Sequence, residues 1–262
     1  MLTMGVDIGS TASKAVILED GCKVISKRVV PVGTGTRGPR EVYESALAAA
    51  GVRPEEISRV VATGYGRMSF EMADRELSEV SCHGRGVRFL LPDVRTVIDI
   101  GGQDAKALLL DERGNLENFI MNDKCAAGTG RFLEVMAGAL GLTTDEMCRL
   151  SEKGRGVTIN SMCAVFAESE VIGLMGRGTA KEDIAYGIVD SIVNKVKTQC
   201  MRMNGRADSY YLTGGLSDNQ VFLYRLSEKI GLPVRSDQNG RFAGALGAAV
   251  IGYQSAVQGG KA

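Results

Sequence analysis

The chain has 262 residues and carries 31 basic and 31 acidic side chains, so its formal net charge is zero. This length suffices for one large domain or two small ones, and the even charge gives no electrostatic reason to expect nucleic acid or an anionic membrane as a partner. No apolar stretch approaches the roughly 18–20 residues of a membrane helix, and Asp7 comes too soon after the start for a signal peptide, so we expect a cytoplasmic protein.

The first predicted elements are two strands joined by a tight glycine turn, in VDIGSTASKAVIL at 6–18. The same pattern returns in IDIGGQDAKALLL at 98–110, and a third strand is predicted after each pair, near 23–30 and 115–121. Six of the thirteen aligned positions are identical, namely Asp7/Asp99, Ile8/Ile100, Gly9/Gly101, Lys14/Lys106, Ala15/Ala107 and Leu18/Leu110. A second similarity lies between VVATGYGR at 60–67 and YYLTGGLSD at 210–218, each a predicted short strand that ends in Thr-Gly before a turn. We therefore predict two copies of one unit.

The two copies differ in length. From its aspartate to its Thr-Gly threonine the first copy covers 56 residues and the second covers 114, an excess of 58. We predict an N-terminal subdomain at 1–92 and a C-terminal subdomain at 93–262, with an insertion around 122–180. Duplication explains the shared strands but not this insertion, so we expect the special function to lie there.

The remaining elements follow from hydrophobic spacing and turn residues. Helices are predicted near 39–50, 79–91, 129–140, 166–176, 181–203, 217–230 and 243–255. Further strands are predicted near 58–62, 157–160, 208–213 and 233–236. The 129–140 helix carries Phe132, Leu133, Met136 and Leu140 on one face, which favours core packing over a docking surface.

The first glycine turn has the groups that a polyphosphate requires. Gly9 permits a tight turn that exposes backbone N–H groups, while Ser10 and Thr11 add hydroxyl donors. Lys14 adds a cation within reach. Asp7, at the end of its strand, is suited to hold Mg²⁺ directly or through water.

The second turn offers a matching set, consisting of Asp99, Gly101, Gly102, Gln103 and Asp104. Gln103 or Asp104 could orient an attacking water, as polar side chains do in phosphoryl-transfer sites. A third segment, Thr213, Gly214 and Gly215, ends a strand and is suited to pack its backbone against an adenosine or its phosphates. One such turn alone would more often be structural, but three turns with an aspartate in each hairpin predict a nucleotide site. The P-loop pattern is absent, and GTGTRGPR at 33–40 is predicted to be a surface loop.

Cys125 and Cys163 are the principal candidates for metal or redox chemistry. Each precedes a predicted helix, in NDKCAAGTGRFLE at 122–134 and SMCAVFAESEV at 161–171. The positive end of a helix dipole favours the thiolate. One chain cannot build a four-cysteine site from two residues, but a two-fold dimer can. Four thiolates suit a [4Fe-4S] cluster or zinc, and a catalytic cysteine nucleophile is a third alternative.

The other cysteines are expected to be less special. Cys22, Cys148 and Cys200 are predicted to be packing residues. A ligand role for Cys82 and His83 stays open as a minor alternative, and His83 is the only histidine of the chain. Six cysteines in a cytoplasmic protein are expected to be reduced, metal-binding or redox-active.

The two hairpin turns and LTGG resemble the superfamily of actin, sugar kinases and heat-shock chaperone ATPases. More narrowly, the chain resembles the activators of 2-hydroxyacyl-CoA dehydratases, also called archerases or component A, of the BadF/BadG/BcrA/BcrD type. The strings that carry this resemblance are GVDIGSTASK, ATGYGR, SCHGRG, VIDIGGQDAK, NDKCAAGTGRFLE, CAVFAESEV and GALGAA. It runs from about Met4 to Tyr253, and NDKCAAGTGRF is its most specific string.

The resemblance implies an α/β protein with a duplicated actin-like, ribonuclease H-like ATPase fold and a nucleotide cleft between two similar subdomains. It implies a homodimer bridged by one [4Fe-4S] cluster, with ligands at Cys125 and Cys163, that binds ATP or ADP with Mg²⁺. A ferredoxin or flavodoxin would reduce the cluster. ATP-driven opening would then pass one low-potential electron to a separate iron–sulfur dehydratase or reductase.

Two other classes stay open. A small-molecule kinase of the same superfamily would transfer phosphate to a sugar or acid, and a chaperone-like or filament-forming ATPase would hold no metal. Both leave Cys125 and Cys163 unexplained. The sequence does not identify the client enzyme, because dehydratases of several 2-hydroxyacyl-CoAs and other double-cluster reductases use similar activators.

Overall fold

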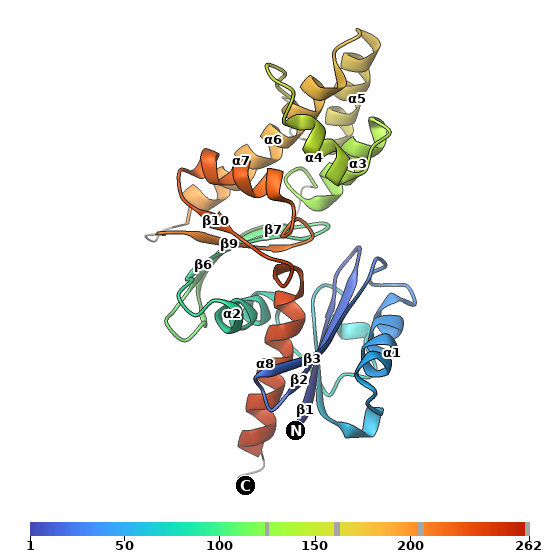
Figure 1. The fold of residues 1–262 in the computed structure, drawn as a ribbon, viewed down its shortest axis with the longest axis vertical. Coiled ribbons are helices and arrows are strands. Elements are labelled where there is room, and N and C mark those ends of the chain that lie inside the picture. The colour runs from blue at the N-terminus through green and yellow to red at the C-terminus, as the bar shows by residue number, and fades with distance from the viewer. Residues whose placement is uncertain (124–125, 160–162, 204–206, 260–262) are drawn as a thin grey trace. The chain divides into compact units, whose positions relative to one another are not determined.

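A computed structural model describes residues 1–123, 126–159, 163–203 and 207–259 (Figure 1). The chain forms two compact units. The first unit contains Met1–Arg95, Leu108–Glu117 and the chain from Asn239 onward, and the second contains Thr96–Ala107 and Asn118–Gln238. The predicted boundary at 92/93 lies three residues before the observed one. The prediction of 93–262 as a single subdomain differs from the structure, because the last helix packs in the first unit.

The sheet of the first unit has the strand order β3-β2-β1-β4-β5. β1 (Leu2–Ile8), β2 (Ser13–Glu19) and β3 (Lys23–Val30) are antiparallel neighbours. β4 (Ile57–Thr63) runs parallel to β1, and the short β5 (Arg75–Glu76) runs parallel to β4. A parallel neighbour requires a crossover, which α1 provides between β3 and β4.

The second sheet has the order β10-β9-β6-β7-β8 and lies mainly in the second unit, although Leu108–Leu110 of β7 and Leu116–Glu117 of β8 belong to the first. Its strands are β6 (Thr96–Ile100), β7 (Ala105–Leu110), β8 (Leu116–Asn122), β9 (Tyr210–Gly214) and β10 (Val234–Arg235). The register repeats that of the first unit, since Asp7 pairs with Thr63 between β1 and β4, and Asp99 pairs with Thr213 between β6 and β9. This correspondence confirms the predicted duplication.

Alternation along β1 explains how the first unit is layered. The even-numbered residues Met4, Val6 and Ile8 are fully buried in a cluster with α1 (Gly38–Ala50). The odd-numbered residues lie on the other face, where a side chain at Gly5 would overlap Ala245 of α8 (Ala243–Gly259). α1 and α8 therefore cover opposite faces of this sheet (Figure 1).

The remaining helix of the first unit, α2 (Glu79–Leu90), packs closely against α8. Glycines make this approach possible. A Cβ on Gly86 would overlap Ala243, and a Cβ on Gly247 would overlap the carbonyl oxygen of Cys82. The two helices thus meet backbone to backbone, which only residues without a Cβ allow. Short 3₁₀ turns at Pro54–Glu56, Arg67–Ser69 and Gly240–Phe242 complete this unit.

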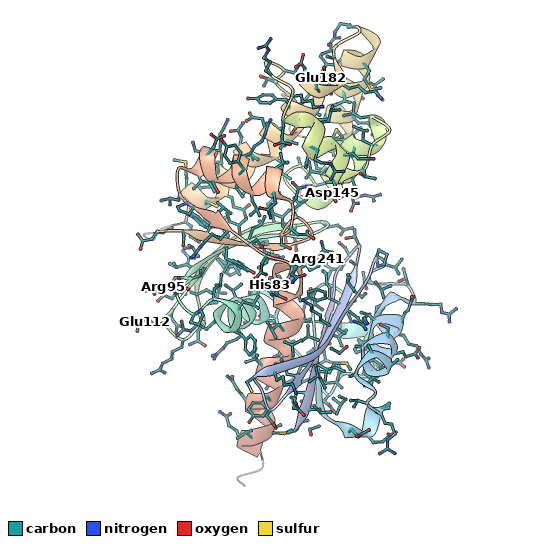
Figure 2. All side chains as sticks on the ribbon, in the orientation of Figure 1. His83, Arg95, Glu112, Asp145, Glu182 and Arg241 are labelled. Carbon is teal, nitrogen blue, oxygen red and sulfur yellow. The ribbon has the colours of Figure 1, made fainter. Side chains whose placement is uncertain are left out.

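The helices of the second unit are α3 (Gly130–Ala139), α4 (Thr144–Ser151), α5 (Ala164–Gly176), α6 (Lys181–Met201) and α7 (Gln220–Ile230). α4 was not predicted, although Thr143 and Glu146 form a capping box at its start. The charged side chains Asp145 of α4 and Glu182 of α6 are labelled in Figure 2. The apolar face of α3 is buried as predicted, with Phe132, Leu133 and Met136 fully enclosed.

The strand predicted near 157–160 is wrong for its described part, because residues 157–159 are irregular. Val157 instead lies against Gly187 of α6, where a Cβ on the glycine would come within 2.9 Å of the Val157 carbonyl oxygen. β-branched residues here serve helix packing rather than sheet pairing. Among the helices of the described residues, none combines the length and apolar character needed to cross a membrane.

Candidate nucleotide turns and cysteine site

The first glycine turn joins β1 to β2 in the first unit. The Gly9 N–H donates to the carbonyl oxygen of Ala12 at 3.0 Å, which closes the turn. The Thr34 N–H donates to the Gly9 carbonyl oxygen at 2.9 Å, and a Cβ on Gly33 would overlap Gly9 and Ser10. The loop predicted at 33–40 therefore supports the turn at its beginning, whereas its end, from Gly38, starts α1.

Asp7 lies at the buried end of this turn. Its Oδ2 is 3.4 Å from the Nζ of Lys14, and the side chain of Lys14 keeps 15% of its area exposed against 6% for Asp7. Gly64, with φ of +86°, lies beside it, and a Cβ there would come within 2.5 Å of the Asp7 Oδ1. The first turn of α8 is also adjacent, through Gly244. The positive end of a helix favours a carboxylate in this position.

Ser10, Thr11 and Gly9 are partly exposed at the tip of the turn. Lys14 is held near them by its ion pair with Asp7. The predicted residues of the first turn are therefore local neighbours in the structure, with two hydroxyls, a backbone turn, a cation and a carboxylate. That donor set suits phosphate oxygens and a divalent cation.

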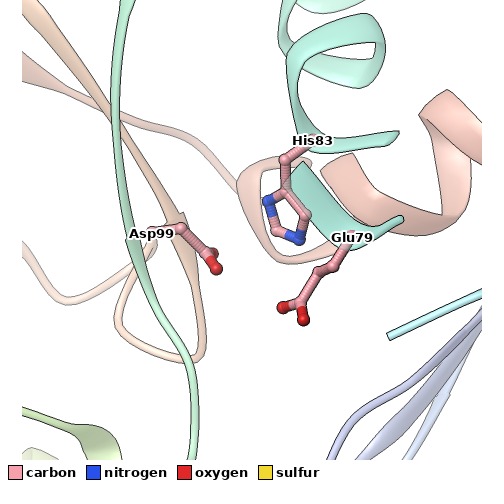
Figure 3. A group of neighbouring side chains, drawn as sticks. All are labelled: Glu79, His83 and Asp99. Carbon is pink, nitrogen blue, oxygen red and sulfur yellow. The ribbon is translucent and has the colours of Figure 1, made fainter. Parts of the chain in front are cut away.

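The second turn, in the second unit, has a different pattern of ion pairs. Asp99 of β6, labelled in Figure 3, accepts a 2.7 Å hydrogen bond from the Thr213 hydroxyl and lies 3.2 Å from the Nζ of Lys106. Lys106 also lies 2.8 Å from Asp104. The Lys106 side chain is only 2% exposed, so its charge is neutralised by two carboxylates away from solvent.

Lys106 was not among the predicted site residues, although it aligns with Lys14 in the duplicated hairpins. Lys106 has one more carboxylate partner than Lys14. The additional partner is Asp104, which occupies the place that Ala12 has in the first copy. Asp104 is thus engaged in an ion pair and keeps 20% of its side-chain area exposed. Gln103 beside it is exposed.

The second turn contacts the start of α3 directly. The Gly130 N–H donates to the Gly101 carbonyl oxygen and the Arg131 N–H donates to the Gly102 carbonyl oxygen, both at 2.9 Å. A Cβ on Gly130 would come within 3.1 Å of the Gly101 carbonyl oxygen. The second turn is thus bonded to the start of α3, the helix that begins five residues after Cys125 in the sequence.

The third predicted segment lies at the end of β9. Gly214 has φ of +89°, and a Cβ there would overlap the carbonyl oxygen of Ile100. Gly215 is exposed, and its N–H donates to the same carbonyl oxygen at 3.3 Å. With Thr213 bound to Asp99, this segment and the second turn form one local group within the second unit.

Of the two cysteines predicted as metal ligands, Cys125 lies outside the described residues. Cys163 is exposed and precedes α5 as its N-cap residue, without a side-chain hydrogen bond in that role. The residues that follow it include an exposed apolar group, consisting of Val165, Phe166 and Ile172. An accessible thiol at the start of a 13-residue helix fits the chemistry of a ligand to an anionic metal cluster.

The other described cysteines differ from Cys163 in their surroundings. Burial raises the pKa of the Cys82, Cys148 and Cys200 thiols to about 12, as expected for cysteines that pack rather than react. The prediction that Cys22 is a packing residue is wrong. It is exposed, because it lies in the turn between β2 and β3.

The second unit also contains a pocket of about 730 Å³. It lies between β8, the 127–128 segment and α6, and its polar lining includes Asn122, Lys195, Gln199 and Arg202. Gln199 uses its side-chain amide to donate to the carbonyl oxygens of Ala105 and Ile120. No predicted site residue in the described part of the chain lines this pocket.

Comparison with known proteins places these observations in a family. The chain is 46% identical over 257 residues to the activator of lactoyl-CoA dehydratase from Anaerotignum propionicum, covering 98% of this chain and 99% of that protein. The structure matches the activator of the 2-hydroxyisocaproyl-CoA dehydratase from Clostridium difficile with bound ADPNP, with a TM-score of 0.94 and 44% identity, over 100% of this chain and 97% of that one.

A more distant match shows the fold alone. A ROK family glucokinase from Streptomyces griseus aligns with a TM-score of 0.60 at 15% identity, over 97% of this chain and 100% of that one. Together with the two repeated sheets, this likeness confirms the predicted duplicated actin-like fold. Residues 4–252 match the family described as the BadF/BadG/BcrA/BcrD ATPase family, and the chain therefore belongs to that family.

Proposed function

We propose that the protein is an ATP-dependent electron-transfer activator of a 2-hydroxyacyl-CoA dehydratase or a related iron–sulfur enzyme. The observation that carries the proposal is Cys163, an exposed thiol at the start of α5, in a chain of an ATPase family whose similar members are named as dehydratase activators. An ordinary packing cysteine would be buried, as Cys148 and Cys200 are.

The nucleotide is assigned to the turns described above. Gly9, Ser10, Thr11 and Lys14 would contact phosphates, and Asp7 would hold Mg²⁺ directly or through water. Within the second unit, the second turn and the Thr213–Gly215 segment are likewise proposed to bind nucleotide. The solved activator from Clostridium difficile, which has ADPNP bound, supports this assignment through its 44% identity with this chain.

Within the second unit, the hydrogen bonds from Gly130 and Arg131 to the second turn supply a route for coupling. A shift of Gly101 or Gly102 with nucleotide state would move the start of α3, because two 2.9 Å bonds join them. The exposed position of Gln103 makes it the better candidate of the predicted pair for orienting an attacking water, since Asp104 is paired with Lys106.

Cys125 and Cys163 are proposed to hold one [4Fe-4S] cluster shared between two copies of the chain. Two thiolates per chain supply the four ligands only in a dimer. The exposed apolar residues Val165, Phe166 and Ile172 on α5, the helix that begins after Cys163, support an interface on that helix, because such side chains gain from leaving water. When bound, the cluster supplies one-electron chemistry at low potential.

The proposed partners follow from this chemistry. A ferredoxin or flavodoxin would donate the electron, and a double-cluster dehydratase or reductase would accept it. The cysteine usage supports a reducing, cytoplasmic compartment, because the five cysteines of the described residues are all unpaired thiols.

Anaerobic purification with iron analysis and absorption spectroscopy tests the cluster. We expect a coloured protein with about two iron atoms per chain, as one four-iron cluster per dimer requires. Cys125→Ala and Cys163→Ala should each remove the iron and the colour. Cys22→Ala is the matched control, because Cys22 is the other exposed thiol of the described residues.

The same preparation tests the rest of the proposal. A colourless, iron-free protein after anaerobic reconstitution would refute electron transfer, and phosphoryl transfer to an added sugar or acid would then identify a kinase. A cluster that persists in either cysteine variant would refute the ligand assignment. Activation of purified dehydratases with different 2-hydroxyacyl-CoA substrates would identify the client.

A further inference from the structure

Two residues of α2 carry chemistry that the proposed function does not use. His83, the only histidine of the chain, is a residue of the first unit with only 4% of its area exposed. Glu79 lies one helical turn earlier, and a carboxylate oxygen of Glu79 lies within 4.8 Å of a ring nitrogen of His83 (Figure 3). Both side chains project from the same side of α2, as residues four apart do.

The imidazole of His83 lies near the carboxylate of Asp7, and both groups lie beside Gly244 of α8. A Cβ built on Gly244 would lie 2.9 Å from the Nε2 of His83 and 3.1 Å from the Oδ2 of Asp7. These two atoms are therefore no more than 6.0 Å apart, the sum of the two distances. Two hydrogen bonds of about 2.9 Å that meet at one water at a near-tetrahedral angle join atoms roughly 4.7 Å apart, which lies within this limit.

The backbone of the first unit explains why these groups meet. Thr3, Gly5 and Asp7 alternate onto the α8 face of β1, where Gly5 lets α8 approach the sheet and the Thr3 hydroxyl donates to the Ala249 carbonyl oxygen at 3.0 Å. The close approach of α2 to α8 at Gly247 then brings His83 to the same end of α8. A side chain on Gly244 would crowd both Asp7 and His83, so glycine is the residue that fits beside them.

We propose that His83 is a positioning residue for the magnesium-binding carboxylate of Asp7, which it holds through a bridging water, with Glu79 orienting the imidazole. The proposal rests on the proposed function, because it takes Asp7 to hold the Mg²⁺ of Mg-ATP. Lys14 holds the Oδ2 of Asp7 from the side of the phosphate turn, at 3.4 Å. His83 would restrain the same carboxylate from the side of α2. The remaining lone pairs of the Asp7 oxygens would then keep one orientation toward the hydrated cation.

The first experiment separates magnesium binding from nucleotide binding. ADP affinity is measured by calorimetry with Mg²⁺ and with EDTA, and the Mg²⁺ concentration for half-maximal ATP hydrolysis is measured in parallel. His83→Ala should weaken Mg-ADP binding and raise the half-maximal Mg²⁺ concentration, each about tenfold, with ADP binding in EDTA unchanged. His83→Gln, whose amide reaches the Nε2 position, should restore most of the loss, and the shorter His83→Asn should not.

A second pair of variants tests the space beside Gly244. Gly244→Ala keeps both His83 and Asp7 but places a methyl group against both, so it should show the same selective loss of magnesium dependence. Gly252→Ala is the matched control on α8. Its Cβ would meet Val61 at 3.1 Å, with no carboxylate or imidazole among its nearest neighbours, and it should leave the magnesium dependence unchanged.

The outcomes distinguish this proposal from the proposed function. If Asp7→Ala abolishes the magnesium dependence while His83→Ala and Gly244→Ala leave it unchanged, His83 is not a positioning residue and the nucleotide assignment stands. Equal losses of ADP affinity with and without Mg²⁺ would also overturn the proposal, because they indicate a general packing role. If Asp7→Ala itself has no effect on magnesium, both the proposal and the Asp7 assignment fail.

Discussion

The Thr213 hydroxyl donates a 2.7 Å hydrogen bond to the Asp99 carboxylate where β9 runs parallel to β6. The first copy has the same backbone register between Thr63 and Asp7, yet the Thr63 hydroxyl donates to the Leu77 carbonyl oxygen at 3.1 Å. Duplicated backbones thus carry different side-chain bonds. Asp99 is held by a threonine and a lysine of its own sheet, whereas Lys14 is the one such partner of Asp7 in the described structure.

Removing the Thr213 hydroxyl should therefore destabilise the protein. Thr213→Val leaves a buried carboxylate without one of its donors, which costs about 1–3 kcal/mol. Thr213→Ser keeps the hydroxyl and should retain most of the stability. The thermal unfolding midpoint of the two variants, measured without nucleotide, checks this expectation, and equal midpoints would contradict it.

The two aligned lysines should behave differently when replaced by methionine. Lys106→Met leaves Asp99 and Asp104 facing each other without their buried cation, so we expect a loss of about 3–5 kcal/mol in the free energy of unfolding. Lys14→Met removes a more exposed cation with a single partner. It should lower ATP affinity with a smaller change in stability. Calorimetric binding and thermal unfolding of both variants decide between these roles, and a reversed order would contradict the ion-pair argument.

Gly5 should tolerate no side chain. Gly5→Ala places a methyl group onto the Ala245 carbonyl oxygen, so α8 must move away from β1 and the midpoint of unfolding should fall strongly. Gly138→Ala in α3 is the matched control, because its Cβ meets nothing within 4 Å. The control should stabilise the protein by about 0.5–1 kcal/mol through helix propensity. A mild effect of Gly5→Ala on thermal unfolding would show that α8 is not packed on β1 as described.

The thiols should separate into two reactivity classes. At pH 8, iodoacetamide should modify Cys22 and Cys163 within the native protein, and Cys148 and Cys200 only after unfolding, because burial raises their pKa to about 12. Mass spectrometry of peptides from the metal-free protein measures this. Fast modification of Cys148 would contradict its burial.

The same pKa shifts predict a loss of stability in alkali. The folded-state pKa of Cys148 and Cys200 is raised above the ordinary value of 9.0, so their contribution is fully present below pH 9. It declines as the pH rises from 9 toward 12, because the unfolded chain releases these protons first. Cys148→Ala should flatten the fall in unfolding free energy over this window, as denaturation at several pH values can measure.

Much of the fold could be predicted because the signals are local. The glycine turns, the repeated hairpins that contain Asp7 and Asp99, and the repeated Thr-Gly strand ends all lie within short segments. α4 was missed because it is short, although the capping box of Thr143 and Glu146 is a local signal that marks its start. Residues 157–159 have strand-forming side chains but pack on α6, so tertiary contact overrode their local preference.

The sequence predicted which site residues lie together in each turn, but not the ion pairs and hydrogen bonds that they form. The donor set of Gly9, Ser10, Thr11 and Lys14 follows from one turn of the chain. That Asp104 shares Lys106 with Asp99 depends on the geometry of a folded hairpin. The hydrogen bonds from α3 to Gly101 and Gly102 depend on how α3 packs against the second turn. Hydrophobic periodicity in the sequence does not predict such a contact.

By itself, the sequence determined the two copies of the hairpin, the chemistry of each turn and the unusual places of Cys125 and Cys163, because these follow from residue type and short spacing. Tertiary structure alone decided that α8 belongs with the first unit and that His83 and Asp7 meet across Gly244. Those contacts join residues far apart in the chain. Their physical cause is the fit of small residues between β1, α2 and α8, which becomes defined only when the three pack together.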